Sequence, residues 1–232
     1  RHALRPARAG ARGNVRIEGF RPDIQALRPR LMLKLADRGR DPVVREILAH
    51  EVQRYLDGEI PMSPIVSTGR ETEAQRGDVA RFARYRAQLD RVESPSERLA
   101  VLSAIGSFRE PAAVDAALDF VLDAPLKPVE VGSVLSELAK HDANLPRLRD
   151  WSMANDTNLR ERLPPSSMAR VPSSLVSCDA APLPAVVDFY GDPKRAAPGI
   201  ERRLAILEVR VAACVALKER EIGSVREYLA EH

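Results

Sequence analysis

Residues 41–58 read DPVVREILAHEVQRYLDG, and this stretch decides the fold. Asp41 can cap a helix whose first residue is Pro42, and Gly58 can end that helix. The apolar residues between them recur at helical spacing and form one face: Val43, Val44, Ile47, Leu48, Val52, Tyr55 and Leu56. The stretch therefore predicts one amphipathic helix with a buried stripe.

The same pattern recurs along the chain: a capping residue or a proline is followed by apolar residues at helical spacing. The predicted helix starts lie at Pro22, Pro42, Pro64, Asp78, Pro95, Pro111, Pro128, Asn144, Pro165, Pro184 and Pro198. Residues 200–221 form the longest uninterrupted candidate. The pattern predicts roughly a dozen helices and no strand.

Short helices joined by short loops must pack mainly against their neighbours in the sequence. Such a series of antiparallel pairs curves into a superhelix. We therefore predict an all-α fold, an irregular α-solenoid of the HEAT or armadillo type without a fixed repeat period. Residues 1–20 are expected to be a linker or a cut end, and residues 21–232 a single helical domain. The expected core includes Leu48, Val52, Leu102, Ile105, Phe108, Leu118, Leu135, Leu204 and Leu207.

Composition favours a soluble protein packed by aliphatic side chains, because 44% of the residues are hydrophobic and only 4% are aromatic. The longest apolar runs, such as residues 212–217, are far shorter than the roughly 20 residues that span a bilayer. No charged and then apolar leader opens the sequence. We expect a cytoplasmic protein without a membrane partner.

The positive charge of the chain is local. Residues 1–60 hold 13 Lys and Arg against 8 Asp and Glu, whereas the whole chain has a net charge of only +3. The arginines among residues 1–20 lack the interleaved aromatic side chains that bind nucleic-acid bases. We expect no nucleic-acid partner, and an RNA-binding helical repeat remains a minor alternative.

The two cysteines, Cys178 and Cys214, lie far apart in the sequence and have no second Cys or His at metal-ligand spacing. They are expected to be small core residues. A disulfide bond between them is the alternative, although such bonds are rare inside cells.

Catalytic motifs are missing from the sequence. His50 and Glu51 begin the His-Glu-x-x-His pattern of a zinc peptidase, but Arg54 stands where the second histidine is required. Gly69 and Gly77 lack the Gly-Lys-Ser/Thr ending of a phosphate-binding loop. The serines at positions 166, 167, 173 and 174 do not lie in a Gly-x-Ser-x-Gly elbow. We therefore expect no catalytic residue, no metal site and no cofactor in this chain.

Several stretches resemble a known family. Residues 105–111 (IGSFREP), 117–119 (ALD), 126–131 (LKPVEV), 151–155 (WSMAN) and 200–204 (IERRL) are similar, in order and spacing, to the C-terminal helical domain of M1-family zinc aminopeptidases. The resemblance extends from about Val15 to the end. Residues 127–130 read KPVE where the family usually has Arg-x-Gln-Asp.

The resemblance implies a role without catalysis. In this family the C-terminal domain closes over the catalytic domain and lines an internal chamber that holds the far part of the peptide substrate. The zinc ion belongs to the catalytic domain of the parent enzyme, so this chain is expected to be inactive alone. The implied partners are that catalytic domain and a peptide. A free-standing helical-repeat module that binds another protein is the alternative function.

Four residues are predicted to face the peptide chamber: Lys127, Arg147, Tyr190 and Arg210. Lys127 occupies the basic position that matches the family before a helix, and Arg210 lies on the long closing helix. Cationic side chains there could hold the carboxylates of a peptide. The opposing interpretation is a solvated outer face with ordinary ion pairs.

Overall fold

The computed structural model describes residues 22–231, with side chains from residue 27 onward. The predicted linker over residues 1–20 lies outside the described residues. Within them the chain forms twelve α-helices, three short 3-10 helices and no strand, so the predicted all-α class is confirmed. In chain order they are α1 (Pro22–Asp37), α2 (Pro42–Leu56), α3 (Pro64–Ala74), α4 (Val79–Leu89), α5 (Pro95–Ile105), α6 (Pro111–Asp123), α7 (Pro128–Leu138), η1 (Asp142–Asn144), α8 (Leu145–Ala154), α9 (Asp156–Arg162), α10 (Pro165–Met168), η2 (Val171–Ser174), α11 (Leu183–Gly191), η3 (Pro193–Arg195) and α12 (Ile200–Glu231).

The predicted caps are present at several helix starts. Asp41 accepts a hydrogen bond from the backbone N–H of Val44 at 2.9 Å, and Ser63 accepts one from Val66 at 3.2 Å. Glu110 accepts from two backbone N–H groups at the start of α6. These bonds satisfy donors that a helix start leaves without partners, which explains why proline and its preceding residue mark the boundaries.

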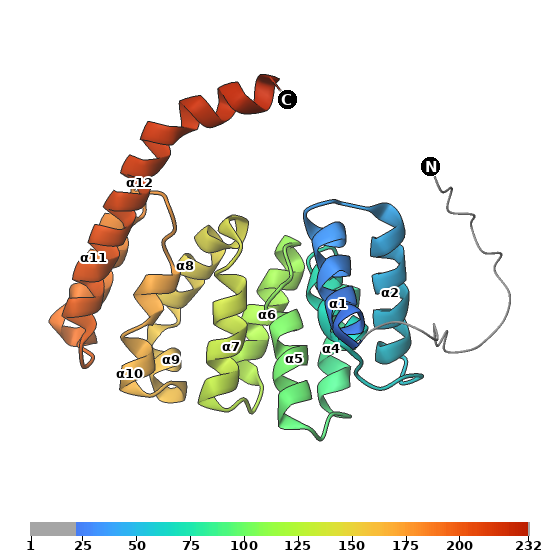
Figure 1. Cartoon of the computed structure of the whole chain (residues 1–232). Helices are drawn as coiled ribbons and strands as arrows, with labels where there is room; N and C mark the ends of the chain where they lie inside the picture. Colours follow the sequence, from blue (N-terminus) through green and yellow to red (C-terminus); the bar gives the residue numbers. More distant parts are fainter. Residues whose placement is uncertain (1–21, 232) are drawn as a thin grey trace, which may run out of the picture.

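The helices form two rows, and Figure 1 shows them side by side along an arc. Helices α1, α3, α5 and α7 contact one another in sequence and make one row. Helices α2, α4 and α6 make the other row. Each of the helices α1–α7 therefore packs against at least one neighbour in the chain and against a helix of its own row, as in an α-solenoid.

All nine residues predicted for the core are buried, and Phe108 lies at its centre. Its ring makes edge-to-face contacts with Phe82 and Tyr85, each with ring centroids 6.0 Å apart. Gly106 precedes this ring and allows α5 to approach α7 closely. A Cβ atom at that position would lie 2.6 Å from the backbone oxygen of Val134, so only glycine fits.

The buried face of α2 differs from the prediction at its first turns. Leu48, Val52, Tyr55 and Leu56 are buried, but Val43 and Ile47 are 63% and 43% exposed. The reason is the position of α2 near one end of the stack, where its main contacts within the described residues are with α1, α3 and α4. The spacing of apolar residues predicted the helix correctly, but it overestimated how many of these residues are buried.

Helix α12 extends ten residues beyond the predicted end at Glu221. Ile200, Leu204, Leu207 and Val211 bury its first part, and it packs against α11 and η2. The helix then projects beyond the rest of the stack, as Figure 1 shows. Packing therefore covers about its first three turns, and the remainder is mostly exposed.

The expectation that the two cysteines are separate core residues is wrong. Cys178 and Cys214 form a disulfide bond, with Cα atoms 5.3 Å apart, and both are only half-buried. The contact could not be predicted from the sequence, because the two cysteines are 36 residues apart and meet only where α12 packs beside the loop before α11. The bond ties α12 to that loop one turn beyond its last buried residue.

No helix within residues 22–231 is both long enough and apolar enough to cross a membrane.

Candidate functional site

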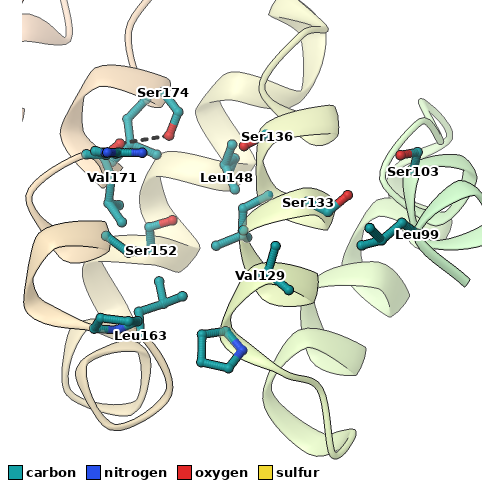
Figure 2. A pocket seen from close by; sticks show the side chains of 17 residues that line it. Leu99, Ser103, Val129, Ser133, Ser136, Leu148, Ser152, Leu163, Val171 and Ser174 are labelled. Carbon is teal, nitrogen blue, oxygen red and sulfur yellow. Dashed lines mark hydrogen bonds between the residues drawn. The ribbon is translucent and has the colours of Figure 1, made fainter. Parts of the chain in front are cut away.

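A groove of about 810 Å³ lies between the middle and the C-terminal part of the stack. Its walls come from α5, α7, α8, α10 and η2, and Figure 2 shows the side chains that line it. These residues are Leu99, Ser103, Pro128, Val129, Gly132, Ser133, Leu135, Ser136, Leu148, Ser152, Leu163, Pro164, Ser167, Arg170, Val171, Ser174 and Leu175. We call this cavity the serine groove, because six of its residues are serines.

Helix α7 forms one wall of the groove. One face of this helix packs in the core, and the opposite face lines the groove. Val131, Val134 and Leu138 point into the core and are fully buried. Gly132 and Ser133 lie on the opposite face, toward the groove. A Cβ atom added at Gly132 would meet nothing within 4 Å. Small residues on this face keep the groove open.

The hydroxyl groups of the groove are not all used inside the protein. The Ser174 hydroxyl donates to the backbone oxygen of Val171 at 2.8 Å. The Ser152 hydroxyl, in contrast, is buried without any hydrogen-bond partner, although Ser152 lines the groove. In Figure 2 this hydroxyl points from its helix toward α7. Within the described residues this hydroxyl has no partner, and a buried polar group without a partner is costly. A ligand that reached this hydroxyl would remove that cost.

The groove is nearly free of charge. Arg170 is the one ionisable residue among those that line it, and the others are serines, prolines, glycine and aliphatic residues. No histidine, lysine or carboxylate lines it to act as a base for a serine nucleophile. Such a surface suits an uncharged, partly apolar chain.

Comparison with known families decides the relationship that the sequence suggested. Residues 5–207 match the family described as the ERAP1-like C-terminal domain. The chain belongs to this family. The resemblance to the C-terminal domain of M1 aminopeptidases is thereby confirmed. A comparison with curated proteins finds no match.

The serine groove of this ERAP1-like domain has Lys127 at its edge. Lys127 is exposed and directly precedes Pro128, which lines the groove. Its backbone N–H donates to Glu130 at 2.8 Å, and Glu130 also accepts from Arg98 at 2.6 Å. The KPVE sequence therefore still forms a polar contact at the start of α7, although it departs from the pattern usual in the family.

Glu130 is 4% exposed and depends on these hydrogen bonds for its charge. Burial alone would raise its pKa. The hydrogen bonds from Arg98 and from the Lys127 backbone outweigh burial, so the pKa of Glu130 lies below its ordinary value. The negative charge of Glu130 thus supports the first turn of α7 and the adjoining edge of the groove.

The structure does not place the other three predicted residues in this groove. Arg147 is exposed and contacts both carboxylate oxygens of Asp115 at 2.7 Å. Arg210 donates to the backbone oxygens of Ser173 and Val176 at 2.7 and 3.1 Å, and so holds η2 against α12.

Tyr190 is fully buried in the core, so its ring has no surface for a peptide to contact. Burial, and then the charge of Asp156, raise the pKa of Tyr190 above its ordinary value. Its hydroxyl has no hydrogen-bond partner in the described residues. Its place next to an inter-helix turn suggested exposure, whereas Val186, one turn earlier on α11, is also fully buried and indicates the face that Tyr190 shares.

The sequence analysis missed the serines of α5, α7 and α8. Ser167 and Ser174 were considered only as nucleophiles. The available signal was the second face of α7, where Gly132, Ser133 and Ser136 alternate with the core residues at helical spacing. Small residues on such a face indicate an open surface rather than a helix contact.

Within the described residues, no three His, Cys, Asp or Glu side chains gather where they could hold a metal ion. Arg54, which replaces the second histidine of the zinc-peptidase pattern, forms ion pairs at 3.3 Å with Glu51 and Glu59. These contacts are ordinary for an exposed helix surface.

Proposed function

We propose that this domain forms a wall of the substrate chamber of an M1 aminopeptidase and binds an extended peptide in the serine groove. Membership of the ERAP1-like C-terminal domain family supports the link to aminopeptidases. The observation that carries the assignment to this groove is the buried Ser152 hydroxyl without a partner in an open, almost uncharged cavity.

The chemistry of the groove suits a peptide better than a charged small molecule. A peptide backbone offers one N–H donor and one C=O acceptor per residue, and serine hydroxyls can pair with either. Leu99, Val129 and Leu163 add apolar surface for the peptide side chains. The cavity volume of about 810 Å³ lies within the range of ligand pockets.

In this proposal the domain positions the peptide and does not cut it. Hydrolysis belongs to a zinc-containing catalytic domain, which is the proposed partner. Binding the far end of a peptide fixes the position of its first bond, and this lowers the entropic part of the barrier. We retain Lys127 as a peptide contact at the edge of the groove, whereas Arg147 and Arg210 are proposed to stabilise the walls.

Two glycine substitutions test whether the groove binds peptide. Gly132→Phe places a ring in the groove, where a Cβ atom has no neighbour within 4 Å. Gly223→Phe is the matched control, because Gly223 also lies in a helix and has open space around it on α12. The ligand is a short peptide of alanine, serine and leucine with capped, uncharged ends. We expect calorimetry to show binding to the wild type and to the Gly223 variant, and none to the Gly132 variant.

Equal binding by both variants would overturn the assignment to this groove. The Ser152→Ala variant adds a second readout that separates binding from folding. Removing a buried hydroxyl without a partner should leave the free domain equally stable or more stable, while it weakens peptide binding. Loss of stability together with loss of binding would instead assign Ser152 a structural role.

The cellular compartment belongs to the same proposal. The sequence favours the cytoplasm, but the Cys178–Cys214 bond is of a kind that persists mainly in oxidising compartments. Thiol labelling of the protein from its native cells decides between them. Two reactive thiols would support the cytoplasm, and a protected pair would rule it out.

A further inference from the structure

A second cavity, of about 310 Å³, lies at the edge of the stack where α1 and α3 end. Arginine dominates its lining: Arg38, Arg40, Arg45, Arg76 and Arg109 line it, against the one carboxylate of Asp37. We call it the arginine cavity. It shares no residue with the serine groove, so nothing inferred about it depends on the proposed peptide binding.

The fold brings these arginines together from four separate segments. Helices α1, α3 and α5 lie in one row and run in the same direction, so their C-terminal ends meet at one edge of the stack (Figure 1). The chain between α1 and α2 supplies Arg38 and Arg40, the first turn of α2 supplies Arg45, the end of α3 supplies Arg76, and the loop after α5 supplies Arg109. A hydrogen bond of 2.9 Å from Arg109 to Gln75 confirms that the last two segments are adjacent.

The ordinary explanation for arginines at this edge is that they neutralise the C-terminal ends of helices. Only Arg45 does so, through a hydrogen bond of 2.6 Å to the backbone oxygen of Ala36. Near the end of α1 the carbonyl groups of Lys34 and Leu35 accept hydrogen bonds from backbone N–H groups, and near the end of α3 those of Glu71, Glu73 and Ala74 do. The side chains of Arg40 and Arg76 form no hydrogen bond to these helix ends within the described residues.

These side chains have few acidic neighbours. Within the described residues, the side chains of Arg40 and Arg76 form no hydrogen bond or ion pair, although burial raises the pKa of Glu73 and the charge of Arg76 opposes that rise by favouring the ionised carboxylate. Arg38 pairs with its neighbour Asp37 at 3.6 Å. Some arginines elsewhere in the stack do have a close carboxylate, for example Arg81 with Glu73 at 2.9 Å. Unpaired guanidinium groups facing one cavity repel one another, so the cavity favours an anion.

The backbone of Arg40 adds an independent observation. Its φ angle is +49°, and it is the one residue other than glycine with a positive φ in the described part of the chain. Glycine adopts this conformation without steric cost, whereas arginine does not. An arginine held there at the edge of the cavity is explained if its side chain binds a ligand.

We propose that the arginine cavity binds a compact polyphosphate anion, with inorganic diphosphate as the simplest representative. A guanidinium group pairs with two oxygens of a phosphate in a fixed geometry. A single carboxylate has only two oxygens and is satisfied by one arginine. Several arginines from different directions match an anion that carries several oxygens and more than two charges.

Calorimetric titration of the 232-residue chain with inorganic pyrophosphate, at physiological ionic strength, tests this site. The test variant is Arg40→Asn with Arg76→Gln, because asparagine tolerates a positive φ and neither arginine side chain forms a hydrogen bond or an ion pair within the described residues. The matched control is Arg202→Gln with Arg203→Gln, which removes the same charge from an exposed part of α12. Each lost guanidinium contact should weaken binding roughly tenfold or more.

We expect the wild type and the control to bind pyrophosphate alike, and the cavity variant to bind at least tenfold more weakly. Orthophosphate should bind more weakly than pyrophosphate to the wild type. Three results would overturn the proposal: equal binding by the cavity variant, equal binding of orthophosphate and pyrophosphate, or no binding at physiological ionic strength. The last result would show that the arginines act only through general attraction, which salt screens.

Discussion

The middle of the stack and the projecting part of α12 differ in how their apolar residues are used. In the middle, Phe108 is fully buried and has aromatic neighbours on α4. On α12, the apolar residues after Val211 are mostly exposed, for example Val225 at 49% and Leu229 at 69%. The match to the ERAP1-like family ends at Leu207, close to the last buried residue of this helix. The family match therefore covers the packed part of the chain and ends near the point where α12 is no longer packed, although the helix itself continues.

The largest effect should follow from emptying the centre of the stack. Phe108→Ala removes a ring with 0% exposure that packs against Phe82 and Tyr85 of α4, so we expect a loss of about 3 to 5 kcal/mol in the free energy of unfolding. Denaturant titration measures this loss. A loss below about 1 kcal/mol in the free energy of unfolding would contradict the claim that apolar residues are more tightly packed in the middle of the stack than on the projecting part of α12.

The disulfide bond joins the two kinds of region, and its removal should have the next largest effect. Cys178→Ser with Cys214→Ser opens a loop of 36 residues, so we expect a loss of about 2 to 4 kcal/mol relative to the oxidised wild type. Hydrogen exchange should increase mainly in α12 and in the loop before α11. Increased exchange throughout the stack would contradict a local role for the bond.

Glu130 provides a smaller effect that depends on pH. Its folded pKa is below its ordinary value, so its contribution to stability is present at neutral pH and is lost as pH falls through the folded pKa. Glu130→Gln should cost about 1.5 to 3 kcal/mol at neutral pH, because it weakens charged hydrogen bonds in a buried position. The difference from wild type should shrink below about pH 4. A difference that is constant with pH would show that the charge of Glu130 does not stabilise α7.

The smallest effect is expected on the projecting helix. Leu229→Ser changes a residue that is 69% exposed and should alter stability by less than about 0.5 kcal/mol. Thermal unfolding measured beside the Phe108 variant makes the comparison direct. A large loss would mean that the end of α12 is covered by part of the protein outside the described residues.

Local signals predicted the helices and their starts, because prolines and capping side chains act within a few residues. They also predicted the buried residues in the middle of the stack. There each helix has neighbours on several sides, so apolar residues at helical spacing are buried. The same reasoning failed for Val43 and Ile47, since the sequence does not show which helices lie at the end of a stack. It also failed for Cys178 and Cys214, because their contact depends on how α12 packs beside the loop before α11.

Most of the site residues predicted from the sequence do not line the proposed groove. Three of the four proposed contacts were charged side chains, and the groove instead presents hydroxyl groups and one arginine. Arg147 and Arg210 form contacts within the protein that only the tertiary structure reveals. Hydroxyl groups on a small-residue face carry little signal in a single sequence, because serines are also common on solvated helices.

The most direct test of the account is to map peptide binding on the isotopically labelled chain by two-dimensional NMR. The ligand is the capped peptide of alanine, serine and leucine. We predict that the amide signals that shift belong to Ser133, Ser136, Ser152 and their neighbours on α5, α7, α8 and η2. Signals from α2 and α4 and from the projecting part of α12 should remain unchanged. Shifts confined to α2, α4 and α6, or no shift at peptide saturation, would contradict the claim that the serine groove binds peptide.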